Sequence, residues 1–381
     1  MGLYTLKSMA GIYIHIPFCK QACHYCDFHF STSLKYKDEL LQALIKEIQL
    51  QKTYLDGEVI ETIYFGGGTP SVLSADEINL LIGTVTGLHT VSSNAEITLE
   101  ANPDDLSKAK IQALRQTDIN RFSIGIQSFF DEDLLWMNRV HRGDEAEASI
   151  KRAQDIGFEN ITADLIYGYP LLNDKKWKHN LDRVFELGIP HISTYSMTVE
   201  PRTALASFIK NKKQPAMNDE QSAEQFILLM DAMQSHGFEH YEISNFCKPG
   251  HYSRHNSNYW KGVKYLGIGP SAHSYNGETR QWNIANNAKY MEALEKSTIP
   301  AETELLTEAD RLNEYIMTSL RTIWGLNLDK LNTIAEAASA QLNVAAQRYF
   351  ENGWIQQTDN VIYLTQTGKL YADNIASELF F

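Results

Sequence analysis

Short hydrophobic strands and amphipathic helices alternate along the first two hundred residues of the chain. Apolar runs of strand length occur at residues 11–16, 59–65, 95–101, 121–127, 160–168 and 191–197. Segments with apolar residues at helical spacing separate them, at residues 40–48, from about residue 75, after residue 103, and at residues 144–156 and 175–187. Such alternation predicts a parallel sheet covered by helices. Because a closed barrel takes eight units, these six predict an α/β fold with a partial (βα)6 barrel.

The rest of the chain has a looser pattern. We expect an exposed loop at residues 211–215, a helix at 219–235 and a strand at 240–244. Further on, helices at 308–323, 328–337 and 344–353 precede two short strands, at 354–359 and 361–366, and a final helix from residue 367. Helices followed by a hairpin indicate a winged-helix-like domain. The expected parts are therefore an N-terminal tail (1–10), the partial barrel with its extension (11–285) and a small helical, winged-helix-like C-terminal domain (286–381).

Polar residues and glycines gather at the carboxyl ends of the predicted strands. A cysteine-containing loop follows the first strand, and the run Gly66–Pro70 follows the second. Strands three to six carry Glu100, Gln127, Asp164 and Tyr195 in or at their ends. The chemistry of barrel proteins collects at this rim, so the pattern predicts a site there. Unpaired carboxylates inside a barrel mouth are costly, which makes Glu100 and Asp164 candidate ligand contacts.

The charge balance limits the classes of partner. The 381 residues include 34 Lys and Arg against 47 Asp and Glu, a net charge of -13. An acidic chain does not favour nucleic acid or anionic lipid as a partner. No apolar run reaches the roughly 18 residues that span a bilayer, and the N-terminus lacks a signal-sequence pattern. We expect a cytoplasmic protein without a transmembrane segment, and peripheral membrane contact through a partner stays open.

Three of the four cysteines, Cys19, Cys23 and Cys26, form a C-x3-C-x2-C pattern directly after the first predicted strand. Thiolates hold iron–sulfur clusters, and a four-iron cluster normally takes one thiolate per iron. Three thiolates predict a 4Fe–4S cluster with one iron open to an exchangeable ligand, as catalytic zinc sites keep an open position. A structural disulfide with one thiol left over is an alternative. Another is a zinc site whose fourth ligand is His15, His24, His29 or Cys247.

The cysteine pattern, with Tyr25 before its last cysteine, resembles that of the radical S-adenosylmethionine (SAM) superfamily, whose open iron chelates the methionine end of SAM. The preceding YIHIPFC resembles the branch that contains oxygen-independent coproporphyrinogen III oxidase and the HemW heme chaperones. The resemblance spans about residues 10 to 381. It implies SAM contacts at Tyr13, Tyr25, Gly67, Gly68, Thr69, Glu100, Gln127, Arg139 and Asp164. Carboxylates and amides suit ribose hydroxyls, and an arginine suits a carboxylate.

A second motif, H-N-x-x-Y-W, contains His255, Asn256, Tyr259 and Trp260. Neutral imidazole is a common axial ligand of heme iron, and aromatic rings pack on porphyrin faces. Composition alone favours a hydrogen-bonded core histidine instead. The motif, together with GIGPSAHS at residues 267–274, resembles the HemW group, which implies heme as bound cargo and His255 as a candidate ligand. His251 and His273 are competitors for that role.

Two functions compete within this branch. A coproporphyrinogen III oxidase would decarboxylate two propionates to vinyl groups through a radical made from SAM, whereas a chaperone would bind heme and deliver it to apo-hemoproteins. The oxidase carries a further cysteine two residues past the last cluster ligand, where this chain has Phe28, and a longer N-terminal extension. Both departures favour the heme chaperone, without coproporphyrinogen III oxidase activity.

Overall fold

The computed structural model of the chain describes residues 9–381. Its strands are β1 Met9–Ile16, β2 Val59–Gly67, β3 Val91–Ala101, β4 Arg121–Gln127, β5 Ile161–Tyr167, β6 His191–Ser196, β7 Glu239–Glu242, β8 Asn245–Cys247, β9 Lys264–Ile268, β10 His273–Tyr275, β11 Thr279–Asn283, β12 Ala301–Leu305, β13 Leu326–Asn327, β14 Ile355–Thr358 and β15 Val361–Leu364. Its α-helices are α1 Lys37–Leu50, α2 Ala75–Leu88, α3 Lys108–Leu114, α4 Asp131–Trp136, α5 Gly143–Asp155, α6 Asp174–Glu186, α7 Ala204–Lys210, α8 Asp219–Ser235, α9 Arg254–Trp260, α10 Asn287–Glu295, α11 Glu308–Leu320, α12 Leu328–Ile334, α13 Ala338–Glu351 and α14 Ala372–Glu378. Of the expected tail, residues 1–8 lie outside the described part, and residues 9 and 10 belong to β1.

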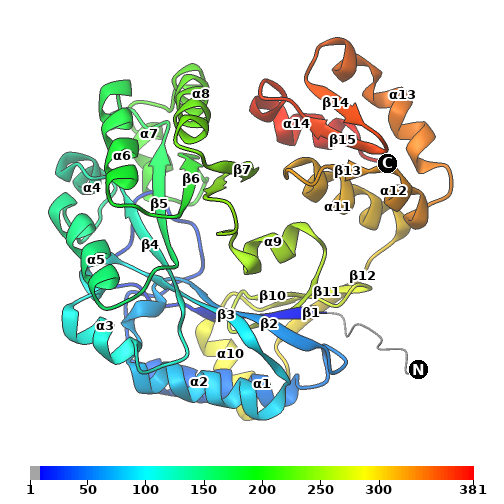
Figure 1. Ribbon diagram of the computed structural model, residues 1–381. Coiled ribbons are helices and arrows are strands. Elements are labelled where there is room, and N and C mark those ends of the chain that lie inside the picture. The colour runs from blue at the N-terminus through cyan, green and yellow to red at the C-terminus, as the bar shows by residue number, and fades with distance from the viewer. Residues whose placement is uncertain (1–8) are drawn as a thin grey trace.

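One curved sheet contains twelve strands in the order β12-β11-β10-β9-β1-β2-β3-β4-β5-β6-β8-β7. Strands β1 to β6 are neighbours in chain order, and each pairs in parallel with the next. Helices α1, α2, α3, α5 and α6 lie along the outside of this curve (Figure 1). The predicted partial (βα)6 barrel is therefore confirmed.

Additional strands extend the six-stranded barrel on both sides. On one side β9 pairs in parallel with β1, so that Ile12 lies beside Leu266, and β10, β11 and β12 continue in antiparallel pairing. On the other side β8 and β7 add to β6, also antiparallel. The strand that leads into the cysteine loop is thus held between two parallel neighbours at the middle of the sheet.

Buried apolar side chains on strands and helices form the barrel's core. Ile12, Ile14 and Ile16 of β1 are at most 1% exposed, and Leu40 and Leu44 of α1 belong to the same cluster. Burying each such side chain stabilises the fold by about 1.5–3 kcal/mol. The helix expected after residue 103 begins at residue 108, since a 3₁₀ turn occupies residues 103–105 and Ser107 caps α3.

The C-terminal unit has a second core and its own sheet. Helices α11 to α14 pack around the three-stranded sheet β13-β15-β14, and the β14–β15 hairpin follows the helices as expected of a winged-helix-like domain. Beyond the expected division after residue 285, Tyr290 and Leu294 still pack in the barrel's core, and β12 pairs with β11. The second core starts at Leu312. We propose a division between β12 and α11.

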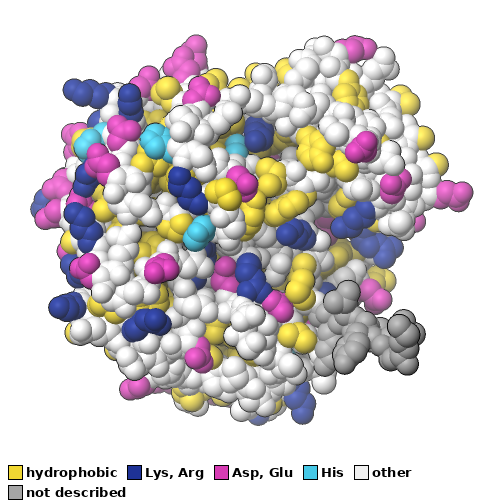
Figure 2. Space-filling model, in the orientation of Figure 1, with side chains coloured by type: hydrophobic (Ala, Val, Ile, Leu, Met, Phe, Trp, Pro, Cys, Tyr) yellow, Lys and Arg dark blue, Asp and Glu magenta, His cyan; other side chains and the backbone are white. Residues whose placement is uncertain are grey.

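The two units meet around β7. The guanidinium of Arg321 lies 3.5 Å from the Glu242 carboxylate, and Lys369 Nζ is 3.0 Å from His240 Nδ1. On the face shown in Figure 2, hydrophobic side chains gather in the middle, where the barrel meets the C-terminal unit in Figure 1, while acidic and basic side chains are interspersed around them. Within residues 9–381 no helix combines the length and the apolar character that a membrane crossing needs.

Candidate functional site

The three clustered cysteines lie on a closed loop at the carboxyl end of β1. Cys19, Cys23 and Cys26 are all partly exposed and carry free thiols. Two backbone hydrogen bonds close the loop: Cys19 N–H donates to the Ser31 carbonyl (3.0 Å), and Ser31 N–H donates to the Pro17 carbonyl (2.9 Å). The loop therefore presents three thiols at the barrel mouth, where the strand pattern predicts a site.

The glycine run at the end of β2 packs directly against this loop. Gly68 N–H donates to the Ile16 carbonyl (2.9 Å), and Thr69 N–H donates to the Phe18 carbonyl (2.7 Å). A Cβ atom on Gly68 would lie 2.6 Å from the Phe18 carbonyl oxygen. One on Gly67 would lie 2.5 Å from the His15 ring, and Gly67 has φ +103°. Both positions require glycine because the end of β2 here touches β1 and the cysteine loop.

Thr69 and Arg139 place polar groups beside the cysteine sulfurs. Thr69 Oγ1 lies 3.4 Å from Cys19 Sγ, and Arg139 Nη1 lies 3.5 Å from Cys23 Sγ. Asn102 links the two, since its Nδ2 donates to Thr69 Oγ1 (3.3 Å) and its Oδ1 accepts from Arg139 Nη2 (2.8 Å). The Arg139 Nε is buried and bonds no atom of the described residues. A carboxylate from a ligand would satisfy that donor.

Gln127 ends β4 in a strained conformation. Its φ of +67° lies in the left-handed region, which is uncommon for a side chain other than glycine or asparagine. A Cβ on neighbouring Gly125 would lie 2.9 Å from the Gln127 Nε2 and 3.3 Å from an Arg139 nitrogen. The amide of Gln127 and the Arg139 guanidinium therefore share the space that Gly125 leaves open. Strain of this kind is typical of functional sites.

Two carboxyl groups line the barrel interior. Glu100 accepts a hydrogen bond from the Tyr64 hydroxyl (2.8 Å), and Ser123 Oγ is 3.2 Å from both oxygens of Asp164. Burial raises the pKa of Glu100 to about 7 and that of Asp164 to about 7. Both carboxyl groups thus titrate near neutral pH, where hydrogen bonds from a ligand's hydroxyls would favour the charged form.

The aromatic candidates border this interior. The Tyr13 hydroxyl lies 3.2 Å from His15 Nδ1, and His15 Nε2 is 3.0 Å from the His29 carbonyl. Tyr25 packs against the barrel's hydrophobic core. Tyr195 is 46% exposed. Phe28, two positions past Cys26, is 70% exposed. The mouth of the barrel therefore carries exposed aromatic surface beside the polar groups.

The geometry of the cysteines bears on the metal that they would hold. Burial raises the pKa of the Cys19 thiol, and that of Cys26 to about 11. Bound metal would displace these protons. Within residues 9–381 no three His, Cys, Asp or Glu side chains converge on a position for one metal ion. The thiolates of a four-iron cluster bind separate irons and need no such convergence.

The residues considered for a zinc site make other contacts. His24 Nδ1 bonds the Trp136 carbonyl (2.8 Å), and His29 Nε2 bonds Asn287 (2.7 Å). Cys247 is fully buried in β8, where it pairs with His191 of β6. Cys247 therefore behaves as a small buried hydrophobe.

His255, the first residue of the H-N-x-x-Y-W motif, is enclosed in the structure. It is 2% exposed; its Nδ1 lies 2.7 Å from Thr62 Oγ1 and its Nε2 lies 2.9 Å from the Tyr259 hydroxyl. Burial lowers its pKa to about 3. The ring fits the hydrogen-bonded core histidine, with no nitrogen free for iron in this conformation. Asn256 and Trp260 are partly exposed on α9, and the Arg321 guanidinium lies 5.3 Å from the Trp260 ring centre.

Two residues of the site escaped the sequence reasoning. Tyr64 bonds Glu100, and Asn102 joins Thr69 to Arg139. Asn102 stands two residues after Glu100 at the end of β3, so the strand-end rule that identified Glu100 would also have found it. Tyr64 lies inside an apolar strand, where nothing in the pattern marks it.

Comparisons with known proteins agree with this geometry. Residues 13–184 match the family model of the radical SAM superfamily, and residues 306–371 match that of the HemN C-terminal domain. The heme chaperone HemW of Bacillus subtilis is 34% identical over 371 residues, which cover 96% of this chain and 98% of that protein. The HemW of Escherichia coli is 36% identical over 270 residues, or 69% of each chain.

The solved structures include one that matches nearly the whole chain. It is the coproporphyrinogen III oxidase (HemN) from Escherichia coli, which is described as a radical SAM enzyme. It superposes with a TM-score of 0.85 at 23% identity, covering 98% of this chain and 90% of the oxidase. This likeness establishes the shared fold of the barrel and the C-terminal unit. With the identity to the HemW proteins along almost its full length, the chain belongs to the HemW family of the radical SAM superfamily.

Proposed function

We propose that this protein is a heme chaperone that binds heme and delivers it to apo-hemoproteins. The observation that carries the proposal is the 34% identity to the heme chaperone HemW of Bacillus subtilis over nearly the full length of both chains. Phe28 supports it, because a thiol stands at this position in the oxidase branch. The protein acts in the cytoplasm, whose reducing state keeps the three free thiols available.

The same proposal assigns a 4Fe–4S cluster to Cys19, Cys23 and Cys26. A cluster held by these three cysteines would supply an electron-transfer centre with one iron open to SAM. The donor set suits it, since the three thiols share one short loop beside Thr69 and Arg139. Hydrogen bonds to cluster sulfurs tune such centres, and these two side chains are placed to donate them.

SAM would occupy the barrel interior next to the cysteine loop. Arg139, with its unpaired Nε, would hold the carboxylate of SAM. Glu100 and Asp164 would accept hydrogen bonds from ribose hydroxyls, and the amide of Gln127 would add a further contact. The glycines at 67 and 68 let the second loop approach the cysteines closely, while Tyr13 and Tyr25 border the ligand. Thr69 completes the set beside Cys19.

The heme site in this proposal involves the H-N-x-x-Y-W motif on α9. Asn256 and Trp260 are partly exposed on α9, and the Trp260 ring lies 5.3 Å from the guanidinium of Arg321 in the C-terminal unit. Hydrophobic side chains gather where the two units meet (Figure 2). Ligation by His255 requires its ring to leave Thr62 or Tyr259. His251 and His273 are exposed and available without rearrangement. Heme spectra of His255→Ala, His251→Ala and His273→Ala variants identify which of the three ligates iron.

The deciding experiment compares two activities of one preparation. Anaerobically reconstituted protein is assayed for acid-labile sulfide, for a heme Soret band, and for vinyl-bearing product from coproporphyrinogen III with SAM and a reductant. We expect a cluster, bound heme and no vinyl product. Product above the level of the Cys19→Ala, Cys23→Ala, Cys26→Ala triple variant would establish the oxidase instead. One equivalent of zinc without sulfide would overturn the cluster assignment.

A further inference from the structure

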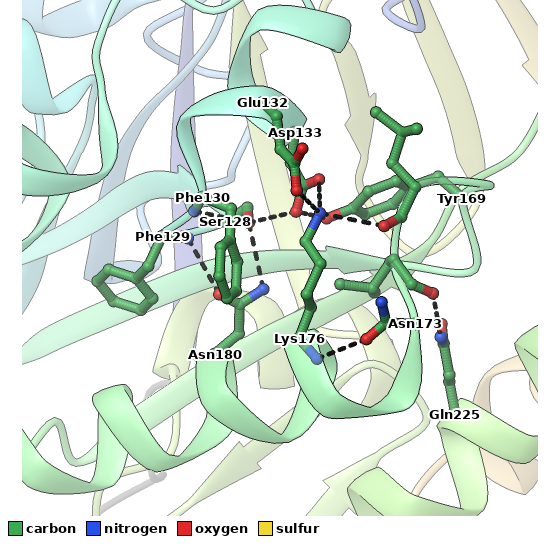
Figure 3. Close-up of polar contacts among 12 residues, drawn as sticks. Ser128, Phe129, Phe130, Glu132, Asp133, Tyr169, Asn173, Lys176, Asn180 and Gln225 are labelled. Atoms are coloured by element: carbon green, nitrogen blue, oxygen red, sulfur yellow. Dashed lines mark hydrogen bonds and ion pairs between the residues drawn. The ribbon is translucent and has the colours of Figure 1, made fainter.

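A buried carboxylate anchors the short helix α4 beside the cysteine loop. Asp133 is fully buried, although it belongs to the acidic sequence DEDLLW. It accepts hydrogen bonds from Ser128 Oγ (2.9 Å) and the Tyr169 hydroxyl (2.7 Å), and it forms an ion pair with Lys176. Figure 3 shows the side chain of Lys176 reaching from α6 to Asp133 at the point where Tyr169 also arrives. Asp133 thereby joins α4 to β4, to the segment after β5 and to α6.

The network extends around this ion pair. Lys176 Nζ also donates to the Leu171 carbonyl (3.0 Å), and it lies 5.0 Å from the centre of the Phe130 ring. Asn180 of α6 donates to Ser128 Oγ (3.2 Å) and accepts from Phe129 N–H (3.0 Å). The start of α4 is therefore fixed to α6 by both charge and hydrogen bonds (Figure 3).

The other end of α4 holds the cysteine loop. The Met137 carbonyl accepts from His24 N–H (3.1 Å), and the Trp136 carbonyl bonds His24 Nδ1 (2.8 Å). Asn138 accepts from Gln21 Nε2 (2.8 Å) at its carbonyl and donates through Nδ2 to the Ala22 carbonyl (2.7 Å). We call residues 136–138 the cradle. Its contacts fall on residues 21, 22 and 24, around Cys23.

The anchor and the cradle are joined within one helical turn. Met137 N–H donates to the Asp133 carbonyl (2.9 Å), and Tyr169, which bonds the Asp133 carboxylate, also stacks on Trp136 at 5.6 Å. Asn138 has φ +60°, so the chain turns sharply at the cradle before Arg139 reaches Cys23 Sγ. A shift of α4 would therefore move both the cradle and the Arg139 guanidinium.

From this arrangement we infer that Asp133 is a positioning residue for the cysteine loop. Asp133 fixes the position of α4, and the cradle then holds the backbone around Cys23 in the conformation in which its thiol can bind iron. The inference rests on the proposed cluster site but concerns the protein without its cluster. The position of α4 is set before metal arrives, which lowers the entropic cost of ordering the loop when iron binds.

The first test measures the loop in the iron-free, full-length protein. Cysteine alkylation is followed residue by residue by mass spectrometry, with buried Cys247 as an internal reference. In Asp133→Asn we expect Cys23 to react about tenfold faster, since losing a charged hydrogen bond changes a local equilibrium by about that factor. Asp131→Asn is the matched control, because Asp131 lies on the same helix and pairs with Arg142 on the surface. It should leave all rates unchanged.

Further variants keep the test decisive if Asp133→Asn folds poorly. Tyr169→Phe removes a single hydrogen bond to Asp133 and retains the ring that stacks on Trp136. Lys176→Met removes the counter-charge, and Lys176→Arg should restore slow alkylation. If Cys23 is alkylated in these variants at the wild-type rate, the effect is absent and the inference is overturned. If alkylation of Cys247 accelerates as much as that of Cys23, the whole protein has loosened, and the inference is overturned as well.

The second test uses the reconstituted protein. We expect the anchor variants to release iron to a chelator several-fold faster than Asp131→Asn protein. If wild-type protein assembles no cluster, the proposed function fails while the alkylation result still decides the role of Asp133. If a cluster forms and both the alkylation and the release rates match wild type, the role of Asp133 fails and the proposed function stands.

Discussion

The ring of His255 stacks on the ring of Tyr64, with centroids 4.9 Å apart and planes inclined by 24°. The Tyr64 hydroxyl in turn donates to Glu100 at the end of β3. A residue of the H-N-x-x-Y-W motif is thereby connected to the barrel interior through a single aromatic ring. In this conformation His255 packs against Tyr64 and thereby holds the residue that bonds Glu100 of the candidate SAM site.

Replacing His255 with alanine should destabilise the protein by about 2–4 kcal/mol, because it leaves a cavity and removes hydrogen-bond partners from the Thr62 and Tyr259 hydroxyls. The free energy of unfolding in urea measures the loss. His273→Ala, at an exposed histidine, should stay within about 0.5 kcal/mol of wild type. Equal losses in the two variants would show that the buried contacts of His255 contribute nothing to the free energy of unfolding.

The affinity for SAM should depend on pH near neutrality. The pKa of Glu100 and that of Asp164 are each raised to about 7, so each carboxyl group is mostly protonated at pH 6 and mostly ionised at pH 8. If the ionised forms accept the ligand's hydroxyls, affinity should be about tenfold lower per carboxyl group at pH 6 than at pH 8. Calorimetric titration of reconstituted protein at the two pH values measures this, and Glu100→Gln should remove part of the dependence. Binding that does not change with pH would show that neither carboxyl group contacts the ligand through its ionised form.

The same raised pKa values make the stability of the ligand-free protein fall as pH rises, whereas the affinity for SAM should rise. Because the folded-state pKa of each group lies above its unfolded value, the folded protein binds more protons between about pH 4 and pH 7. The contribution of Glu100 and Asp164 to the free energy of unfolding should therefore fall as pH rises through this window and level off above it. Comparing wild type with the Glu100→Gln, Asp164→Asn double variant across pH isolates the effect. A difference that grows in the variant's disfavour as pH rises would contradict it.

Gly67→Ala and Gly83→Ala should shift stability in opposite directions. A Cβ at Gly67 meets the His15 ring at 2.5 Å in a backbone with positive φ, so we expect a loss of at least about 2 kcal/mol and poorer retention of the cluster. Gly83 lies exposed within α2 with open space around it, and alanine there should stabilise by about 0.5–1 kcal/mol. Chemical denaturation and iron analysis of both variants provide the comparison. A Gly67→Ala variant as stable as wild type would mean that the His15 ring moves aside at little cost.

Removing the guanidinium of Arg321 should weaken the contact between the two units. Its partner Glu242 has a side chain only 1% exposed, and burial raises the pKa of that carboxyl group. Arg321→Ala is expected to cost about 1–3 kcal/mol, because the loss leaves a buried acceptor without its charged donor. Arg142→Ala, which breaks an exposed pair with Asp131, should cost less than about 0.5 kcal/mol. Similar costs for both arginines would show that the junction does not depend on this pair.

The repeating part of the fold could be predicted because local patterns determine it. Each strand from β1 to β6 is a short buried run, and the strand-end rule placed the cysteines, Glu100, Gln127 and Asp164 at one rim. Helix α8 begins and ends at the predicted residues. Helix α13, in contrast, starts at residue 338 instead of the expected 344, and Ala338 and Leu342 of its first turns belong to the second core.

The pairings between distant segments could not be predicted. Strand β9 lies within the glycine-containing run before residue 270, and its parallel partner β1 is at the other end of the barrel sequence. His255 bonds Thr62, which lies 193 residues earlier in the chain, so no local pattern identifies its partner. Asp133 appeared in a run of acidic residues that is typical of a solvent-exposed helix. Its burial depends on Tyr169 and Lys176, which the fold alone brings to it.

The pairing of β1 between β2 and β9 has a consequence for biosynthesis. Ribosomes add roughly 5–20 residues per second, so β9 emerges roughly 10–50 s after β1. Until then one edge of β1 lacks its partner strand, and the cysteine loop that follows β1 is attached to an incomplete sheet. Such long-range closure also slows folding, because chain entropy must be lost before the contact forms. Metal insertion is therefore expected after translation, on a chain in which β1 has both of its neighbouring strands.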